Sequence, residues 1–196
     1  DCVYEGQRNV VIEDYTGHTC GNCPRAAEVL HDLEATYGSR IIPIAVHVGF
    51  FADVQNNPDG SYATNFKTPA GNQWNTEFGC SAQGLPNGLI NRRQEGGGYP
   101  QSYTAWTAQV ANLLELEPDA SIALDVAYEE SSRTVNVDID VTAFNDLASG
   151  PYNIVVCLTE DSIVDWQKDY DPSLADENLE HYVHMHALRT NFNGTW

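Results

Sequence analysis

The stretch that decides the fold of this chain is Cys20-Gly21-Asn22-Cys23-Pro24. A short apolar-rich run over residues 9–15 precedes it and predicts a strand. Residues 25–37 follow it with apolar side chains at helical spacing. A C-x-x-C pair between a strand and a helix places a thiol at the N-terminus of that helix. The partial positive charge of this helix end favours thiolate, the reactive form, over thiol.

Strand and helix patterns continue to alternate beyond the motif. The predicted strands cover residues 10–15, 41–48 and 85–92, and the predicted helices cover residues 25–37, 68–78 and 102–116. Thr68 is expected to cap the second helix, with Pro69 in its first turn. This alternation favours a three-layer α/β domain, which we place at residues 1–117.

The pattern changes at Glu117-Pro118-Asp119. Apolar and polar side chains alternate over residues 122–128 and 135–141, on either side of a short turn. This pattern predicts a hairpin with one solvent-exposed, acidic face. Further strands are predicted at 152–159 and 182–190, joined by a long acidic connection. Strands without intervening helices favour an all-β, sandwich-like (immunoglobulin-like) domain over residues 118–196.

Four predicted strands are few for a sandwich, and the chain ends at Trp196, just after the plausible turn Asn193-Gly194. We therefore expect that native C-terminal sequence is missing and that this domain is truncated. A closed second domain, with no unpaired edge and no exposed apolar face, would contradict this expectation.

Composition excludes several classes of function. Nine basic against 28 acidic residues give the 196-residue chain a net charge of -19, and such a polyanion repels nucleic acid. No apolar run reaches the roughly 18 residues of a transmembrane helix. No basic start followed by an apolar stretch is present, so any export signal lies outside this sequence.

The residues that a disulfide oxidoreductase needs are grouped around the motif. Cys20 is the expected nucleophile, and Cys23, one helical turn in, is the expected resolving thiol. Asp14, near the end of the preceding strand, can move protons for Cys23, and His18 can stabilise the thiolate. Pro86 completes the set if its peptide bond with Leu85 is cis, because a substrate chain can then lie alongside.

At this point the sequence resembles the thioredoxin-like superfamily over residues 9–116. The resemblance is carried by Cys20, Cys23, Asp14 and Pro86. The chain departs from the common pattern in two places. Thr19 stands where an aromatic residue commonly precedes the first cysteine, and Gly21-Asn22 replaces the common Gly-Pro pair.

Three longer stretches, at residues 11–24, 84–92 and 184–189, resemble the 28-kDa outer-membrane protein family of Bacteroidetes. The resemblance implies a thioredoxin-like domain joined to a β-sandwich. It also implies an exported, lipid-anchored protein in the periplasm or outer membrane of a Gram-negative bacterium. Lipidation of Cys2 itself is disfavoured, because Asp1 stands where a small uncharged residue is usual.

Two functions from different classes remain open. The first is thiol-disulfide exchange with protein thiols or disulfides in the cell envelope, which needs no cofactor. The second is a non-enzymatic envelope protein that uses the scaffold to bind a partner or a glycan, with Cys20 and Cys23 as an inert disulfide. Zinc is disfavoured, because no second C-x-x-C or C-x-x-H supplies further ligands.

Other candidate residues are better explained structurally. His184 and His186 stand two apart on a predicted strand and can share a metal, but a surface or hydrogen-bonded role is commoner. Calcium binding is possible for the acidic connection, although it has no D-x-D-x-D-G loop. Cys80 and Cys157 are expected to be core residues. The acidic side chains of that connection are Asp161, Asp165, Asp169, Asp171 and Asp176.

Overall fold

The computed structural model describes residues 6–144 and 152–193. Its α-helices are α1 (Cys23–Tyr37), α2 (Pro69–Phe78) and α3 (Tyr103–Leu114). The strands of the first part are β1 (Val10–Thr16), β2 (Ile41–His47) and β3 (Asn87–Ile90). The later strands are β4 (Ala120–Glu129), β5 (Thr134–Ala143), β6 (Cys157–Glu160), β7 (Ile163–Lys168), β8 (Asn178–His184) and β9 (Ala187–Asn191).

Local sequence signals explain where the helices begin and end. The Thr68 hydroxyl accepts a hydrogen bond from the Gly71 N–H at 3.0 Å, which caps α2 as the sequence predicts. Gly79, with a left-handed φ of 68°, ends this helix. In α1, Pro24 lies in the first turn, where its missing N–H costs no helical hydrogen bond.

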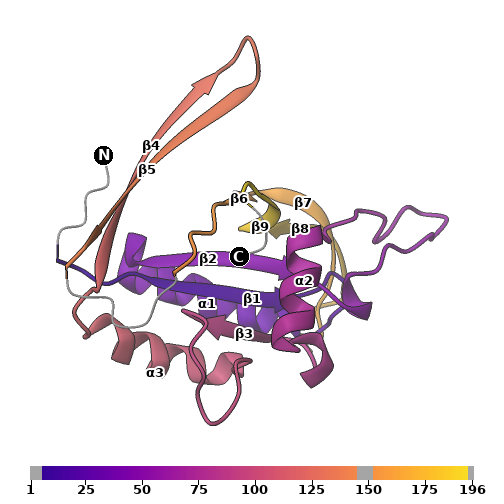
Figure 1. Ribbon diagram of the computed structural model, residues 1–196. Helices are drawn as coiled ribbons and strands as arrows, with labels where there is room; N and C mark the ends of the chain where they lie inside the picture. Colours follow the sequence, from indigo (N-terminus) through magenta and orange to yellow (C-terminus); the bar gives the residue numbers. More distant parts are fainter. Residues whose placement is uncertain (1–5, 145–151, 194–196) are drawn as a thin grey trace.

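A five-stranded sheet in the order β3-β1-β2-β9-β6 forms the centre of the molecule (Figure 1). Strands β1 and β2 are parallel, and β3 runs antiparallel to β1. Strand β9 pairs in parallel with β2, and β6 pairs antiparallel with β9 at the edge. The last strand of the chain therefore lies beside one of the first.

Helices cover both faces of this sheet. The face packed against α1 and α3 carries one hydrophobic cluster, in which Trp106 is fully buried. The face packed against α2 carries a second cluster, which includes Trp74 and Leu188 of β9. The described part of the chain thus forms a mixed α/β layer structure followed by a β-rich region.

We expect Trp106→Ala to lower the free energy of unfolding by about 3–5 kcal/mol, because it removes a buried indole. A Cβ at Gly88 would lie 2.4 Å from this ring, so the ring fills its site without spare room. Urea denaturation of the oxidised protein measures the change. Tyr128→Ala, which truncates an aromatic ring that is 60% exposed, is the control and is expected to change stability by less than about 0.5 kcal/mol.

The predicted hairpin is present as β4 and β5, and it projects away from the α/β body (Figure 1). Its register pairs Ile122 with Val141 and Leu124 with Ile139, so apolar side chains gather on one face. Ile122 and Leu124 are exposed. The described residues therefore leave this face uncovered.

The region after residue 118 differs from the expected sandwich. Strands β6 and β9 extend the first sheet, while β4–β5 and β7–β8 are separate two-stranded sheets. The acidic connection predicted over residues 161–181 contains β7. The single strand predicted over residues 182–190 is divided between β8 and β9, because His186 adopts a positive φ of 55°. Half-buried alternation predicts a strand but does not identify the sheet that the strand joins.

Candidate functional site

Cys20 and Cys23 form a disulfide between the end of β1 and the start of α1. Their Cα atoms are 5.4 Å apart. The Cys20 N–H donates to the Gly17 carbonyl at 3.0 Å, and the Cys23 N–H donates to the Cys20 carbonyl at 3.1 Å. Cys23 is the first residue of α1, whose N-terminal dipole stabilises a thiolate when the bond is reduced.

Asp14 lies on β1 and is buried on the face that carries α1. Its Oδ1 has no hydrogen-bond partner among the described residues. Burial raises the pKa of this carboxyl from 3.8 to about 7, since desolvation disfavours the charged form. A carboxyl group with this pKa can release and accept a proton at neutral pH.

The peptide bond between Leu85 and Pro86 is cis, which is the condition under which Pro86 is expected to complete the set. Asn87 follows it, and its side-chain amide donates to the Cys80 carbonyl at 2.8 Å and to the Gly84 carbonyl at 2.6 Å. These hydrogen bonds stabilise the turn that leads into β3. Strand β3 pairs with β1, which also leads into the C-x-x-C loop.

The His18 side chain contacts the loop between β2 and α2. Its Nε2–H donates to the Asp53 carbonyl at 3.0 Å, and its ring meets Tyr62 and Phe66 edge-on. Burial lowers the pKa of this imidazole, so the neutral form is favoured. His18 therefore anchors the C-x-x-C loop to Asp53, and its role beside a thiolate stays a prediction.

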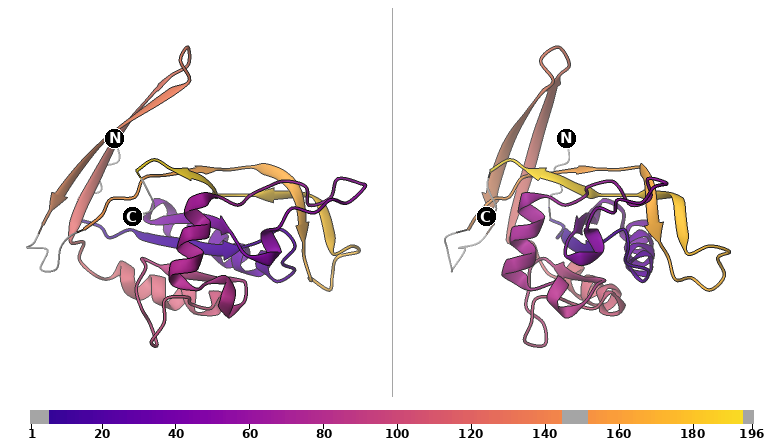
Figure 2. Two further views of the ribbon diagram at one scale, coloured as in Figure 1. Left: turned by 45° about the vertical axis from the view of Figure 1, so that its right-hand side comes forward. Right: turned by 90° about the vertical axis from the view of Figure 1, so that its right-hand side faces the viewer.

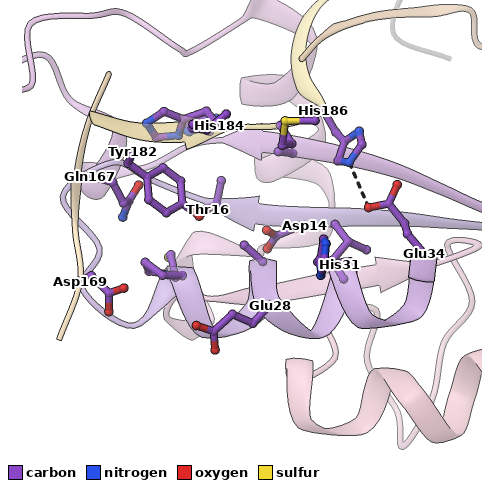
Figure 3. A pocket seen from close by; sticks show the side chains of 18 of the residues that line it. Asp14, Thr16, Glu28, His31, Glu34, Gln167, Asp169, Tyr182, His184 and His186 are labelled. Atoms are coloured by element: carbon purple, nitrogen blue, oxygen red, sulfur yellow. Dashed lines mark hydrogen bonds and ion pairs between the residues drawn. The ribbon is translucent and has the colours of Figure 1, made fainter. Parts of the chain in front are cut away.

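A cavity of about 420 Å³ lies between α1 and β8, and both Asp14 and Cys23 line it (Figure 3). Polar side chains of β1, of α1, of β8 and of the turn after β8 surround it. Those labelled in Figure 3 include Asp14, Thr16, Glu28, His31, Glu34, Tyr182, His184 and His186. The cavity places the Asp14 carboxyl and Cys23 beside one space that is large enough to hold water.

His47 is a site residue that sequence reasoning missed. It ends β2, lines the same cavity as Asp14, and stacks on Phe66 with ring centroids 4.5 Å apart. Neither ring nitrogen has a hydrogen-bond partner among the described residues. Burial lowers the pKa of His47 well below 6.5, so its ring is neutral. The apolar run around it predicted a buried strand but gave no sign of the cavity.

A second feature that the sequence did not predict is a later segment of the chain that covers the disulfide. Cys20 and Cys23 are only 3% and 2% exposed. The chain around β7 lies across their loop, where the Lys168 N–H donates to the His18 carbonyl at 2.8 Å. The Gln167 side chain donates to the Cys20 carbonyl at 3.1 Å. The disulfide is therefore shielded from solvent by a segment nearly 150 residues later in the sequence.

The predicted pair His184 and His186 does not converge. The His184 Nε2–H donates to the Trp166 carbonyl at 3.3 Å. His186 lies 3.1 Å from carboxylate oxygens of both Glu34 and Asp161. Burial lowers the pKa of His184 to about 4. Both histidines therefore have structural partners, in agreement with the commoner role.

Within residues 6–144 and 152–193, no group of three or more His, Cys, Asp or Glu side chains is arranged to hold a metal ion. In the acidic connection, Asp169 and Asp171 lie 2.8 Å and 3.5 Å from Arg25 nitrogens. The acidic side chains closest to the site are thus used in ion pairs.

The two other described cysteines are free thiols. Cys80 is buried in the cluster under α2, as expected, and Cys157 is half-buried in β6. Burial raises the pKa of Cys80 to about 12 and that of Cys157 to about 11. Both thiols stay protonated at neutral pH and are poor nucleophiles. Cys2 lies outside the described residues.

Comparison with known proteins identifies one family and two related folds. Residues 71–196 match the family described as "Outer membrane protein Omp28". HBP35 of Porphyromonas gingivalis has a TM-score of 0.60 at 17% identity, over 96% of this chain and 58% of that one. A structural-genomics protein from Agrobacterium tumefaciens has a TM-score of 0.52 at 12% identity, over 94% of this chain and 72% of that one. No curated protein sequence matches.

At these identities the two solved structures support the fold alone. The family match begins inside α2 and therefore does not include the C-x-x-C motif. Among the helices in the described ranges, none has the length and apolar character needed to cross a bilayer. The chemistry of the site must be argued from its own geometry.

Proposed function

Because the chain belongs to the Omp28 outer membrane protein family and is an exported protein of the cell envelope, we propose that it exchanges disulfides with envelope proteins. Its N-terminal half serves as a thioredoxin-like module, and Cys20 and Cys23 are the exchanging pair. The observation that carries this proposal is the buried Asp14 carboxyl, whose Oδ1 has no hydrogen-bond partner among the described residues and which shares a cavity with Cys23. An inert disulfide has no need of a costly buried acid at this place.

The exchange proceeds in two displacements. In the reduced protein the Cys20 thiolate attacks a partner disulfide, a bond forms between Cys20 and one partner sulfur, and the other partner sulfur leaves as a thiolate. Cys23 then gives its proton to Asp14 and attacks the Cys20 sulfur, which releases the partner's first sulfur as a thiolate. Two electrons pass to the partner, and a partner dithiol returns them by the reverse steps.

Insulin reduction in the presence of dithiothreitol tests this function. The protein is expected to accelerate insulin precipitation, and Cys20→Ser is expected to remove the acceleration, because the serine hydroxyl cannot form the mixed disulfide. Both proteins carry Cys2→Ser, so that a thiol outside the described residues does not contribute. Equal rates for the Cys20→Ser variant and its parent would refute the proposal.

The burial of both cysteines favours a second candidate. In this alternative the protein is a non-enzymatic envelope protein, the disulfide only staples the loop, and the scaffold binds a partner or a glycan. Reduction should then mainly destabilise the fold, by the roughly 2–4 kcal/mol typical of a lost disulfide. A reduction potential well below about -300 mV would support this reading, because structural disulfides resist reduction by thiols.

A further inference from the structure

The segment that follows the core of β7 is bonded to the C-x-x-C loop along its backbone. The Lys168 N–H donates to the His18 carbonyl, and the Tyr170 N–H donates to the Gly21 carbonyl, each at 2.8 Å. The two donors are two residues apart, which is the spacing along one edge of an extended chain. Residues 168–170 therefore lie against the loop in the way an added strand lies against a sheet edge.

Two side chains of the covering segment also contact the C-x-x-C loop. The Gln167 amide donates to the Cys20 carbonyl at 3.1 Å. The Tyr170 ring lies directly on Gly21, where an added Cβ would be 2.5 Å from ring carbons. Glycine is therefore required between the cysteines for the ring to lie so close. The Tyr170 ring of the covering segment is therefore in close contact with the backbone of the C-x-x-C loop.

Two ion pairs join the covering segment to α1, and Asp169 forms the closer of them. The Arg25 guanidinium lies two residues after Cys23, and its Nη2 donates to both Asp169 carboxylate oxygens, at 2.8 and 3.0 Å. Asp169 is buried, so this charge-assisted contact is protected from solvent. The pair ties the covering segment to the helix that carries the resolving cysteine.

The covering segment belongs to a hairpin that is not part of the main sheet. Strands β7 and β8 form their own two-stranded sheet. Figure 2 shows this ribbon running past the end of the main sheet that carries the C-x-x-C loop. A two-stranded ribbon has little stability of its own, so its attachment rests on the contacts with the loop, with α1 and with its neighbours.

We propose that the β7–β8 hairpin is a latch that occupies the place of an extended substrate segment, and that it must be released before Cys20 can exchange. The His18 and Gly21 carbonyls, now bonded to the latch, then accept backbone N–H groups from a partner chain that carries a disulfide or a dithiol. This inference rests on the proposed function and adds its partner class and its regulation.

The first test compares how fast dithiothreitol reduces the Cys20–Cys23 disulfide in matched variants. Asp169→Asn removes the closer of the two carboxylate charges of the latch that pair with Arg25, and it is expected to speed reduction about tenfold or more, because the latch opens more often. Glu160→Gln is the control, since it removes an ion pair with Arg189 in the β6–β9 region. An unchanged rate in Asp169→Asn, or an equal acceleration in Glu160→Gln, would overturn the latch.

Hydrogen exchange distinguishes latch opening from general destabilisation. In Asp169→Asn the amides of Lys168 and Tyr170 are expected to lose protection, while amides of β1 and β2 keep theirs. Loss of protection across the whole sheet would count against a local latch. Tyr170→Ala is a second variant, which removes the ring over Gly21 without touching the ion pair, and it is expected to speed reduction as well.

The outcomes of the two assays distinguish a failure of the latch from a failure of the proposed function. Faster reduction of the Asp169→Asn disulfide without any insulin reduction would keep the latch and refute exchange as the function. Insulin reduction at one rate in the parent and in Asp169→Asn, with unchanged disulfide reduction, would keep exchange and refute the latch. Acceleration of both reactions supports the two proposals together.

Discussion

Asp14→Asn is expected to raise the free energy of unfolding by about 4 kcal/mol at pH 8, but by only about 0.5 kcal/mol at pH 4. The folded-state pKa of Asp14 is raised from 3.8 to about 7 because the carboxyl is buried. The unfolded chain therefore loses this proton at lower pH than the folded protein does. Stability contributed by protonated Asp14 is complete below pH 3.8, falls as the pH rises, and is lost above pH 7.

Urea denaturation of the oxidised protein at pH values between 4 and 8 measures this difference. Subtracting the parent from the variant at each pH cancels the titration of the other groups. Asp138→Asn, which replaces an exposed carboxylate of β5, is the control and should give a difference that is small at every pH. A constant difference for Asp14→Asn would show that this carboxyl titrates normally.

Asp14→Asn should slow disulfide exchange, although it is expected to stabilise the fold. If Asp14 takes the proton of Cys23, the asparagine variant loses a general base, and exchange is expected to slow by about a hundredfold near pH 7. Greater stability with lower activity is the pattern expected of a group kept for function at a cost to the fold. A variant as active as the parent would exclude Asp14 from the proton transfer.

Cys23→Ser is expected to stop exchange at the mixed disulfide between Cys20 and the partner. The first displacement needs only the Cys20 thiolate, whereas release of the partner needs the Cys23 sulfur. The variant should therefore accumulate a covalent complex with reduction-sensitive linkage, and turnover should fall to the uncatalysed rate. Non-reducing electrophoresis and mass spectrometry of the variant mixed with a disulfide-bonded protein measure the complex.

The other described thiols serve as an internal control for this trap. Cys80 and Cys157 have pKa values raised to about 12 and about 11, so neither is expected to form the complex at pH 7. Adding Cys20→Ser to Cys23→Ser should remove the covalent complex. A complex that survives this second change would assign the reactive thiol elsewhere and contradict the role of Cys20.

Local signals predicted the elements around the motif well, because each depends on neighbours in sequence. Thr68 before Pro69 marked the start of α2, and apolar spacing marked α1. The cis bond before Pro86 meets the condition stated for that residue, and the resemblance to the outer-membrane family is confirmed over residues 71–196. These features are determined within short stretches or by a family pattern.

The other features of the fold and of the site could not be predicted, because they depend on contacts between distant parts of the chain. Strand β9 meets β2 through a register in which Ala187 pairs with Ala45, and no local pattern specifies that pairing. The latch contacts the loop mainly through backbone groups, which leave no signature in side-chain types. Asp169 is one of several acids in its segment, so its ion pair with Arg25 could not be distinguished from a solvated charge.

The position of the latch in the chain has a consequence for the order in which the protein is built. Synthesis and translocation deliver residues 20–23 well before residues 163–191, and domains fold from the N-terminal side as the chain appears. Before β7 docks, we expect both thiols to be open to oxidants, because the contacts of residues 167–170 with the loop are not yet made. Docking of β7 and β8 is then expected to end the period in which the two cysteines exchange freely.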